Sequence, residues 1–325
     1  MKPLSVQTLQ KNYRNGTPEP FVGLGRPEGQ ETAGNISFEV DKGEVFGLIG
    51  PDGAGKTTLF RMLATLLLPD KGTATVEGMD IRSDYKAIRH RIGYMPGRFS
   101  LYQDLTVAEN LGFFATLFDT TVAANKALID PIYRHIEPFK NRLAGHLSGG
   151  MKQKLALSCA LVHKPSLLLL DEPTTGVDAV SRGEFWDMLG NLKAEGITIL
   201  VSTPYMDEAL RCDRVALIQD GRFLDIDSPA GIIAHFEPRL LAIEGVKITR
   251  LLKDLRQLEG VKQCHAFGDS LHVTVTDPQL QPQRLSDLLA SMGHTGITVT
   301  PITPGIEDCF LALGTPSSSS KPPRP

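Results

Sequence analysis

The sequence predicts an α/β fold organised around a phosphate-binding loop, followed by a smaller α+β module. Three observations carry this prediction. A complete G-x-x-x-x-G-K-[ST] motif lies between an apolar strand and a helix. Further along, a run of four leucines ends in two carboxylates. Finally, residues 240–302 alternate in the order β-α-β-β-α-β, the pattern of ferredoxin-like modules.

The phosphate loop follows a predicted strand at 45–49 and precedes a predicted helix at 59–68, which Pro69 ends. Its glycines let the backbone turn tightly and present N–H groups to phosphate oxygens. The helix start favours an anion at the same place. Lys56 adds a charge that can reach the terminal phosphates, and Thr57 offers a hydroxyl to Mg²⁺. A chance glycine-rich turn is the alternative, which the complete motif disfavours. The loop residues are Gly50, Pro51, Asp52, Gly53, Ala54, Gly55, Lys56, Thr57 and Thr58.

Composition limits the possible classes of protein. A length of 325 residues suggests two domains, and a hydrophobic content of 41% supports proper cores. The formal net charge of -3 argues against a nucleic-acid binder held by bulk charge. The four cysteines are far apart and the eight histidines scattered, so neither predicts a metal site. No stretch approaches the roughly 20 apolar residues of a membrane helix, and the N-terminus lacks the apolar core of a signal peptide. We expect a soluble chain that reaches a membrane only through a partner.

The first part of the chain reads as short strands. Residues 4–13 are predicted to form an edge strand, and 14–34, rich in Gly, Pro and Glu, a loop. Residues 35–40 alternate apolar and polar side chains, as a half-buried strand does. A turn at 41–44 then leads into the phosphate-loop strand, and a further strand is expected at 73–76.

The middle of the chain is predicted to be mainly helical. A basic, solvated helix is expected at 85–91, then a buried strand at 92–95. Thr106 and Glu109 have the spacing of a capping box, which predicts a helix start. Apolar helices are expected to follow to about residue 139.

A second diagnostic segment, LSGGMKQ at 147–153, precedes a predicted helix at 154–162. It places Ser148, Gly149 and Gly150 at a helix N-terminus, which is an anion-binding position. Alone, this segment would be weak evidence.

The third segment is the leucine run at 167–170, which predicts a strand buried on both faces. Asp171 is placed to hold Mg²⁺ through water, and Glu172 to polarise an attacking water. The alternative is an ordinary acidic turn, which the upstream phosphate loop disfavours. The remaining elements of this part are a helix at 181–195, a buried strand at 197–202 and a hairpin of strands 214–219 and 222–226.

Together, the phosphate loop, LSGGMKQ and LLLLDEP resemble the nucleotide-binding subunit of an ATP-binding-cassette (ABC) transporter over residues 4–235. The TTGVD turn and the STPYMDEA segment resemble the subgroup that serves ABC-2-type exporters of drugs, lipids or polysaccharides. The resemblance implies a P-loop NTPase core with a predominantly parallel sheet, an antiparallel β subdomain, and a helical subdomain near 99–160. It also implies ATP and Mg²⁺ as ligands, and a head-to-tail dimer with ATP between the phosphate loop of one subunit and the LSGG segment of the other.

The same resemblance assigns roles by position. Tyr13 would stack on adenine, and Asp178 would be the dimer-contact aspartate of the D-loop. The signature residues that act on the partner's ATP would be Leu147, Ser148, Gly149, Gly150 and Gln153. The implied partners are an integral membrane permease and a second ABC ATPase, with no nucleic acid. The implied location is the cytoplasmic face of the inner or plasma membrane, through the permease. There, segment 98–110 would meet the permease, and we expect Phe99, Leu101 and Tyr102 to be partly exposed.

Three departures from the family pattern matter. Gly97 stands where a glutamine that senses Mg²⁺ and the γ-phosphate is expected, and Pro204 where a switch histidine is expected. The gap between Tyr13 and the phosphate loop is longer than usual, so a packing role is the alternative for Tyr13. With two sensors absent, we expect an impaired site of its own and a heteromeric assembly with a more complete ATPase.

We expect three parts: an ATPase domain at 1–238, an accessory α+β domain at 239–314, and a disordered Ser/Pro-rich tail at 315–325. The accessory domain holds no catalytic constellation and fits a docking or regulatory module. Residues 305–310 resemble the tail ending of exporter ATPases.

Three functions compete. The first is an ATPase subunit that powers export through a separate permease. The second is a nucleotide-binding half that hydrolyses little and completes a partner's site. The third is a cassette ATPase of translation or DNA repair. Such proteins usually carry two cassettes in one chain or a long coiled-coil insertion, and this sequence shows neither pattern. The mild acidity also counts against this function.

Overall fold

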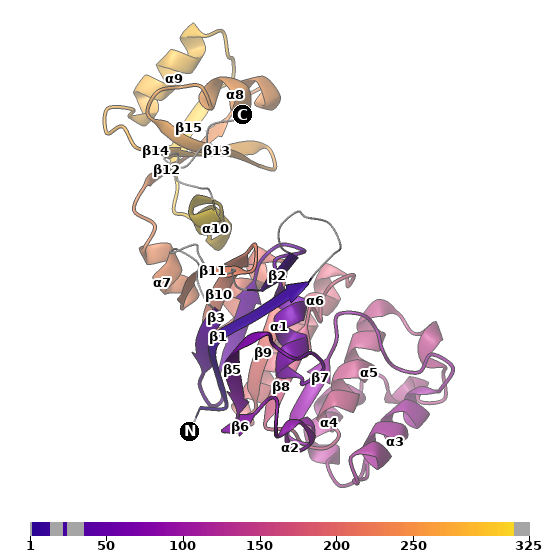
Figure 1. Cartoon of the computed structure of the whole chain (residues 1–325). Coiled ribbons are helices and arrows are strands. Elements are labelled where there is room, and N and C mark those ends of the chain that lie inside the picture. Colours follow the sequence, from indigo (N-terminus) through magenta and orange to yellow (C-terminus); the bar gives the residue numbers. More distant parts are fainter. Residues whose placement is uncertain (1, 14–21, 25–35, 315–325) are drawn as a thin grey trace. The chain divides into compact units, whose positions relative to one another are not determined.

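The computed structural model describes residues 2–13, 22–24 and 36–314 (Figure 1). Its chain divides into two compact units, Met1–Pro229 and Ala230–Pro325. Most of the loop expected at 14–34 and the tail expected at 315–325 lie outside the described residues. Within the described part, no helix has the length and apolar character needed to cross a membrane.

The first unit is built on a six-stranded sheet in the order β11-β10-β4-β9-β8-β7. Strands β10, β4, β9, β8 and β7 are parallel neighbours, and β11 is antiparallel. Three inner strands, β4, β8 and β9, are buried along their whole length, as expected for continuous apolar runs covered on both faces. The strands are β4 (Val45–Ile49), β7 (Ile92–Met95), β8 (Leu167–Asp171), β9 (Thr198–Thr203), β10 (Arg214–Gln219) and β11 (Arg222–Asp227).

This strand order determines where the site lies. The carboxyl ends of parallel strands meet at one edge of the sheet, which is where α/β proteins bind ligands. The phosphate loop follows β4, the acidic pair ends β8, and β9 lies between them. Segments far apart in the sequence are thereby brought to one edge.

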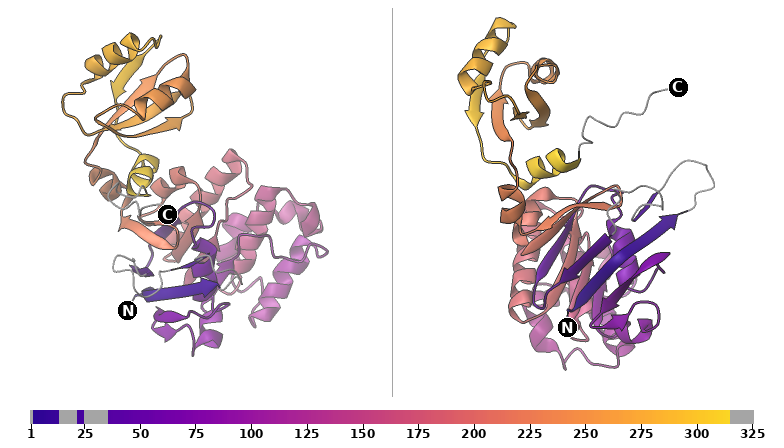
Figure 2. Two further views of the ribbon diagram at one scale, coloured as in Figure 1. Left: turned by 45° about the horizontal axis from the view of Figure 1, so that its top comes forward. Right: turned by 60° about the vertical axis from the view of Figure 1, so that its left-hand side comes forward.

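A second sheet is antiparallel, with the path β2-β1-β5-β6 and β3 also paired to β1. Its strands are β1 (Leu4–Tyr13), β2 (Val22–Leu24), β3 (Ile36–Val40), β5 (Lys71–Val76) and β6 (Met79–Asp80). The right-hand view of Figure 2 shows these strands, in indigo and purple, along one side of the unit. The predicted edge position of residues 4–13 is wrong, because β1 pairs on both sides. The expectation of an uninterrupted loop at 14–34 is also wrong at β2.

Helix α1 (Lys56–Leu63) begins and ends earlier than the predicted range of 59–68. Its start follows from the left-handed conformation of Gly55 (φ 101°). Its end follows from Thr65 (φ 61°), after which the N–H groups of Leu66 and Leu67 both donate to the carbonyl of Arg61. This closing turn satisfies the carbonyls that the last helical turn leaves free.

The helical part of the first unit contains α3 (Val107–Leu117), α4 (Lys126–Tyr133) and α5 (Gly149–Leu161), joined by single turns at Glu137–Phe139 (η1) and Ala144–His146 (η2). The capping box predicted for Thr106 and Glu109 is confirmed at the start of α3. Helix α5 begins earlier than the predicted 154–162. The remaining helices are α2 (Tyr85–Arg89), α6 (Ala179–Ala194), the turn η3 (Met206–Arg211) and α7 (Pro229–Ala234) at the boundary of the units.

The second unit has four antiparallel strands in the order β13-β14-β12-β15. Its elements are β12 (Arg239–Glu244), α8 (Ile248–Leu255), β13 (Val261–Phe267), β14 (Ser270–Val275), α9 (Pro282–Ser291), β15 (Thr298–Pro301) and α10 (Ile306–Gly314). The core packs leucines of α8 and α9, such as Leu251 and Leu285, against Leu241 and Val273 of the sheet. Asp308 of α10 bonds to His272 of β14 (2.7 Å).

Candidate nucleotide site

The phosphate loop has the backbone that its sequence predicts. Gly53 (φ 80°) and Gly55 (φ 101°) are left-handed, a region that glycine adopts without cost. Gly50 is required for a different reason, because a Cβ there would lie 2.1 Å from the carbonyl oxygen of Ile218. Its N–H donates to the carbonyl of Thr203 (3.3 Å), which joins the loop to the end of β9.

Lys56 begins α1, and its side chain is almost fully buried. Its ammonium donates to the carbonyl oxygens of Gly50 (2.8 Å) and Pro51 (3.0 Å). It also lies 3.0 Å from Oε1 of Glu172. These three partners match the three donors of an ammonium. In this structure Glu172 therefore takes the place at Lys56 that a phosphate oxygen would occupy.

Asp171, the last residue of β8, is buried. Its Oδ1 accepts from the hydroxyl of Ser202 (2.8 Å), while Oδ2 has no hydrogen-bond partner within the part of the chain that the structure describes. Burial raises the pKa of Asp171, and hydrogen bonding from Ser202 and Thr57 opposes that rise. A buried carboxylate oxygen without a partner, close to a threonine hydroxyl, fits Mg²⁺, which is commonly held by one or two protein oxygens together with phosphates.

Glu172 adopts an unusual backbone conformation, with φ of 50°. For a residue other than glycine this conformation is costly and is often found at functional sites. Its N–H donates to both the carbonyl (3.1 Å) and the hydroxyl (3.0 Å) of Ser202. Its Oε2 accepts from the hydroxyl of Thr175 (3.4 Å), which leaves Oε1 facing Lys56. Ser202 therefore holds the carboxylate of Asp171 and the backbone of Glu172, a role that our sequence reasoning missed.

Tyr13 ends β1 at the rim of this site. Its hydroxyl lies 3.2 Å from that of Thr58, and the side chain is 38% exposed. It lines a cavity of 150 Å³ together with Gly53, Gly55, Lys56, Thr57, Thr58 and Glu172. The structure thus brings Tyr13 to the phosphate loop, whereas its stacking on adenine stays a prediction.

The LSGG segment lies elsewhere in the unit. Ser148 caps α5 by accepting from the N–H of Met151 (3.4 Å), so the helix begins at Gly149. A Cβ on Gly150 would lie 2.9 Å from the hydroxyl of Ser181. Asp178 caps the neighbouring helix α6 by accepting from the N–H of Ser181 (2.9 Å). The predicted signature and D-loop residues are thus packed together, and none lines the cavity at the phosphate loop.

Comparison with known proteins agrees with these features. The ABC transporter family model matches residues 33–175. The chain is 38% identical over 282 residues to the Nod factor export ATP-binding protein I of Burkholderia lata. The aligned region covers 86% of this chain and 90% of that protein. The chain belongs to the ABC transporter ATP-binding protein family.

Other members of this family extend the comparison. The probable multidrug ABC transporter ATP-binding protein YbhF of Escherichia coli is 40% identical over 315 residues, which is 95% of this chain and 53% of YbhF. The chain therefore spans about half the length of YbhF. A solved ATP-binding subunit of an ABC transporter has a TM-score of 0.61 at 28% identity, covering 72% of this chain and 92% of that one. The dimeric cassette MJ0796 shares the fold, with a TM-score of 0.58 at 22% identity. The superposition covers 69% of this chain and 98% of the MJ0796 chain.

The two departures from the expected ABC pattern, Gly97 and Pro204, follow strands β7 and β9 of the central sheet. Gly97 follows β7, and a Cβ there would lie 3.1 Å from the carbonyl oxygen of Asp171 and 3.7 Å from Cβ of Glu172. Pro204 directly follows β9, between the buried Thr203 and Tyr205. Position 97 therefore lies next to both acidic residues, and neither Gly97 nor Pro204 has a polar side chain.

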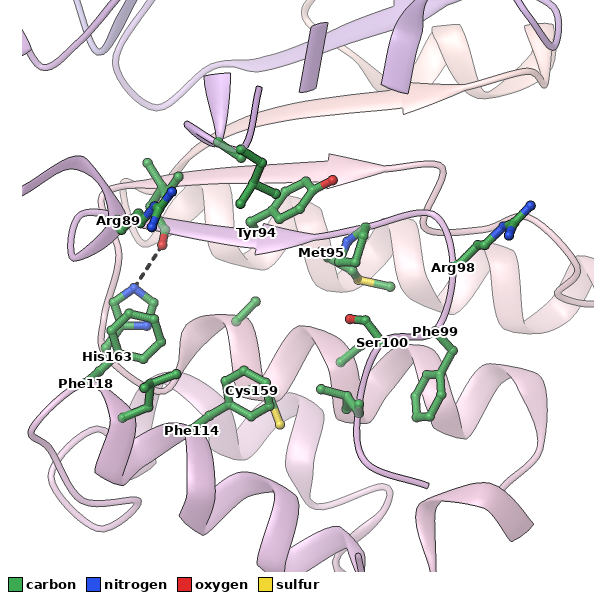
Figure 3. Close-up of a pocket in the computed structure, with 18 of the residues that line it drawn as sticks. Arg89, Tyr94, Met95, Arg98, Phe99, Ser100, Phe114, Phe118, Cys159 and His163 are labelled. Carbon is green, nitrogen blue, oxygen red and sulfur yellow. Dashed lines mark hydrogen bonds between the residues drawn. The ribbon is translucent and has the colours of Figure 1, made fainter. Parts of the chain in front are cut away.

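A second, largely apolar cavity of 420 Å³ lies between the β7 end of the sheet and helices α3 and α5 (Figure 3). Figure 3 shows Met95, Phe114 and Cys159 around this space, with Arg98 directed away from it. Phe118 stacks on His163 with ring centroids 3.8 Å apart.

The predicted exposure of the loop beside this cavity is confirmed in part. Tyr102 is 51% exposed and Phe99 is half-buried, but the expectation for Leu101 is wrong, because it is 7% exposed and lines the cavity. The reason is the fold-back of the loop onto α3: the side-chain oxygen of Asn110 accepts from the N–H of Tyr102 (3.0 Å), and its amide donates to the carbonyl of Tyr102 (2.9 Å).

Proposed function

We propose that this chain is the ATP-binding subunit of an exporter, working with a separate membrane permease and a second ATPase cassette. One observation carries the proposal: Lys56, Asp171 and Glu172 converge at one edge of the sheet, while the LSGG segment lies outside that cavity. The cavity therefore has groups that bind phosphate and activate water, and it lacks a signature segment. A second cassette that presents its own LSGG segment would supply the missing part.

The residues divide the work at this site. Lys56 and the loop N–H groups hold the phosphates, and Thr57 and Asp171 hold Mg²⁺, which neutralises phosphate charge when bound. Glu172 orients and polarises the attacking water once it is released from Lys56. Ser148, Gly149 and Gly150, at the start of α5, would bind the γ-phosphate of the ATP held by the partner. Asp178, which caps α6 beside them, would contact the partner cassette.

We infer that the two ATP sites of such a pair are unequal. The site that uses this chain's Glu172 has Gly97 and Pro204 where polar sensors act in the family, so it binds ATP and turns over slowly. The other site uses this chain's intact LSGG segment and sets the rate if the partner is complete. The assembly would therefore be heteromeric. A chain that binds ATP and hydrolyses little is the second candidate, which the same two residues favour.

The permease would bind beside the second cavity. Tyr102 is exposed there, and its ring meets that of Phe113, also exposed, at 4.9 Å. Neighbouring aromatic side chains that are both exposed are typical of an interaction site. An ABC-2-type permease would hold the chain peripherally on the cytoplasmic face of the membrane.

The test of the proposal is binding of MgATP to the full-length chain by calorimetry. Lys56→Ala should abolish detectable binding, because it removes the charge-assisted contact to the phosphates. Lys42→Ala, on an exposed turn, is the control and should bind as the wild type does. Equal affinity of Lys56→Ala and wild type would show that the loop does not bind phosphate.

A further inference from the structure

Arg182, on the first turn of α6, contacts three residues of the segment that follows Pro204. Its Nη2 lies 2.8 Å from Oδ2 of Asp207, and its Nε lies 3.6 Å from Oε1 of Glu208. Its guanidinium also covers the ring of Tyr205, 4.3 Å from the centroid. One side chain thus joins the helix that Asp178 caps to the loop in which Pro204 lies.

Glu208 continues this connection to the acidic turn. It is 3% exposed, and its Oε2 accepts from the hydroxyls of Thr174 (3.1 Å) and Thr203 (2.5 Å). Thr174 belongs to the turn that begins at Glu172, and Thr203 is the last residue of β9. A single buried carboxylate therefore ties the Glu172 turn to the strand that precedes Pro204.

A buried charge here is costly to the fold unless it is paired, and an apolar side chain would fill the space with less desolvation. The pairing is also incomplete. Oε1 of Glu208 and Nε of Arg182 face each other at 3.6 Å, beyond hydrogen-bond length, and neither atom has a hydrogen-bond partner among the described residues. This contact is longer than the hydrogen bonds and the other ion pair that the side chains of Arg182 and Glu208 make. A small displacement of α6 would therefore shorten or break it.

We propose that Arg182 and Glu208 are positioning residues that couple the start of α6 to the turn carrying Glu172. Neither lines the cavity at the phosphate loop. They act through Thr174 and Thr203, and Thr203 adjoins Ser202, whose carbonyl and hydroxyl hold the N–H of Glu172. A movement of α6 would thereby change the position of Glu172 relative to Lys56. The inference rests on the proposed function only in taking MgATP as the ligand that moves the turn.

The test is hydrogen–deuterium exchange of the full-length chain, with and without MgATP. Glu208→Gln keeps the size and an acceptor for the two threonine hydroxyls but removes the charge. Arg182→Lys keeps the charge but loses the planar group that covers Tyr205. The matched control is Asp187→Asn, which breaks another ion pair between α6 and η3, that of Asp187 with Arg211 (3.2 Å), where both side chains are exposed.

Without nucleotide, residues 172–178 should exchange about threefold faster or more in both test variants than in the wild type, because the turn opens locally. Asp187→Asn should exchange as the wild type does. MgATP should slow exchange at residues 178–184 in the wild type and in the control. In the test variants this slowing should be lost while the affinity for MgATP stays within about threefold, which a purely structural role would not produce.

The proposal is overturned if both test variants exchange like the wild type, or if MgATP still protects the start of α6 in them. Failure of the wild type to bind MgATP would contradict the proposed function instead, and the nucleotide-free comparison would still decide the positioning role. If Glu208→Gln does not fold, Arg182→Lys decides the outcome alone.

Discussion

The ammonium of Lys56 and the carboxylate of Glu172 form an ion pair of 3.0 Å, with Lys56 buried. These are the residues that the proposed mechanism uses to hold phosphate and to activate water. In this structure Glu172 is the acidic partner of Lys56, so a phosphate that binds the ammonium of Lys56 must displace Glu172. Binding of ATP and release of the general base would therefore be one event.

This pairing predicts that Glu172→Gln binds nucleotide more tightly. The change removes a competitor for Lys56 and a negative charge beside the phosphates, and we expect affinity to rise about tenfold, equivalent to about 1.4 kcal/mol. A non-hydrolysable ATP analogue, titrated by calorimetry, excludes any effect of turnover. Glu184→Gln, which breaks the ion pair of the exposed Glu184 with Lys154, should leave affinity unchanged. Weaker binding by Glu172→Gln would mean that the ion pair does not compete with phosphate.

A second prediction concerns which site sets the rate in the full complex. Ser148→Arg blocks the LSGG segment that would serve the partner's ATP, and it should lower ATP hydrolysis at least about hundredfold, a loss of about 3 kcal/mol of transition-state stabilisation. Glu172→Gln should lower the steady-state rate less than about twofold, because we propose that its own site contributes little to turnover. Equal loss in the two variants would contradict the inequality of the sites.

A third prediction is that sensors can be restored. Gly97→Gln with Pro204→His should raise hydrolysis at this chain's own site about tenfold, since the pair of changes returns the polar side chains proposed to sense the γ-phosphate. The gain in hydrolysis should be limited, because a Cβ at position 97 would lie 3.1 Å from the carbonyl oxygen of Asp171. The backbone of Asp171 would have to move slightly to accommodate it. The measurement uses a complex whose partner cassette lacks its own phosphate-loop lysine. No gain, with MgATP binding intact, would show that the two residues do not limit this site.

The proposed permease contact gives a fourth prediction. Tyr102→Cys should crosslink to the permease in native membranes, because that side chain is exposed and directly follows Leu101, which lines the apolar cavity. Leu101→Cys, adjacent in sequence but buried, is the matched control and should not crosslink. Crosslinking by neither variant would place the permease contact elsewhere on the chain.

Features that depend on neighbouring residues could be predicted from the sequence. The phosphate loop was predictable because its backbone needs glycines at particular positions and an adjoining helix start. The capping box of Thr106 and Glu109 is likewise a local hydrogen-bond pattern. The buried character of β8 followed from its unbroken leucines, because only a strand covered on both faces tolerates them.

The tertiary structure alone decided features that depend on distant partners. Hydrophobic alternation in β1 shows that one face is buried, but it does not reveal that strands pair along both edges. Leu101 is buried by a fold-back that Asn110 holds from another element. The pairing of Lys56 with Glu172, and of Arg182 with Glu208, depends on the order of β4, β9 and β8 in the sheet, since that order brings remote segments to one edge. The spacing of residues along the chain predicts on which face of a helix or strand a side chain lies. The order of strands in the sheet determines which distant residues pack against that face.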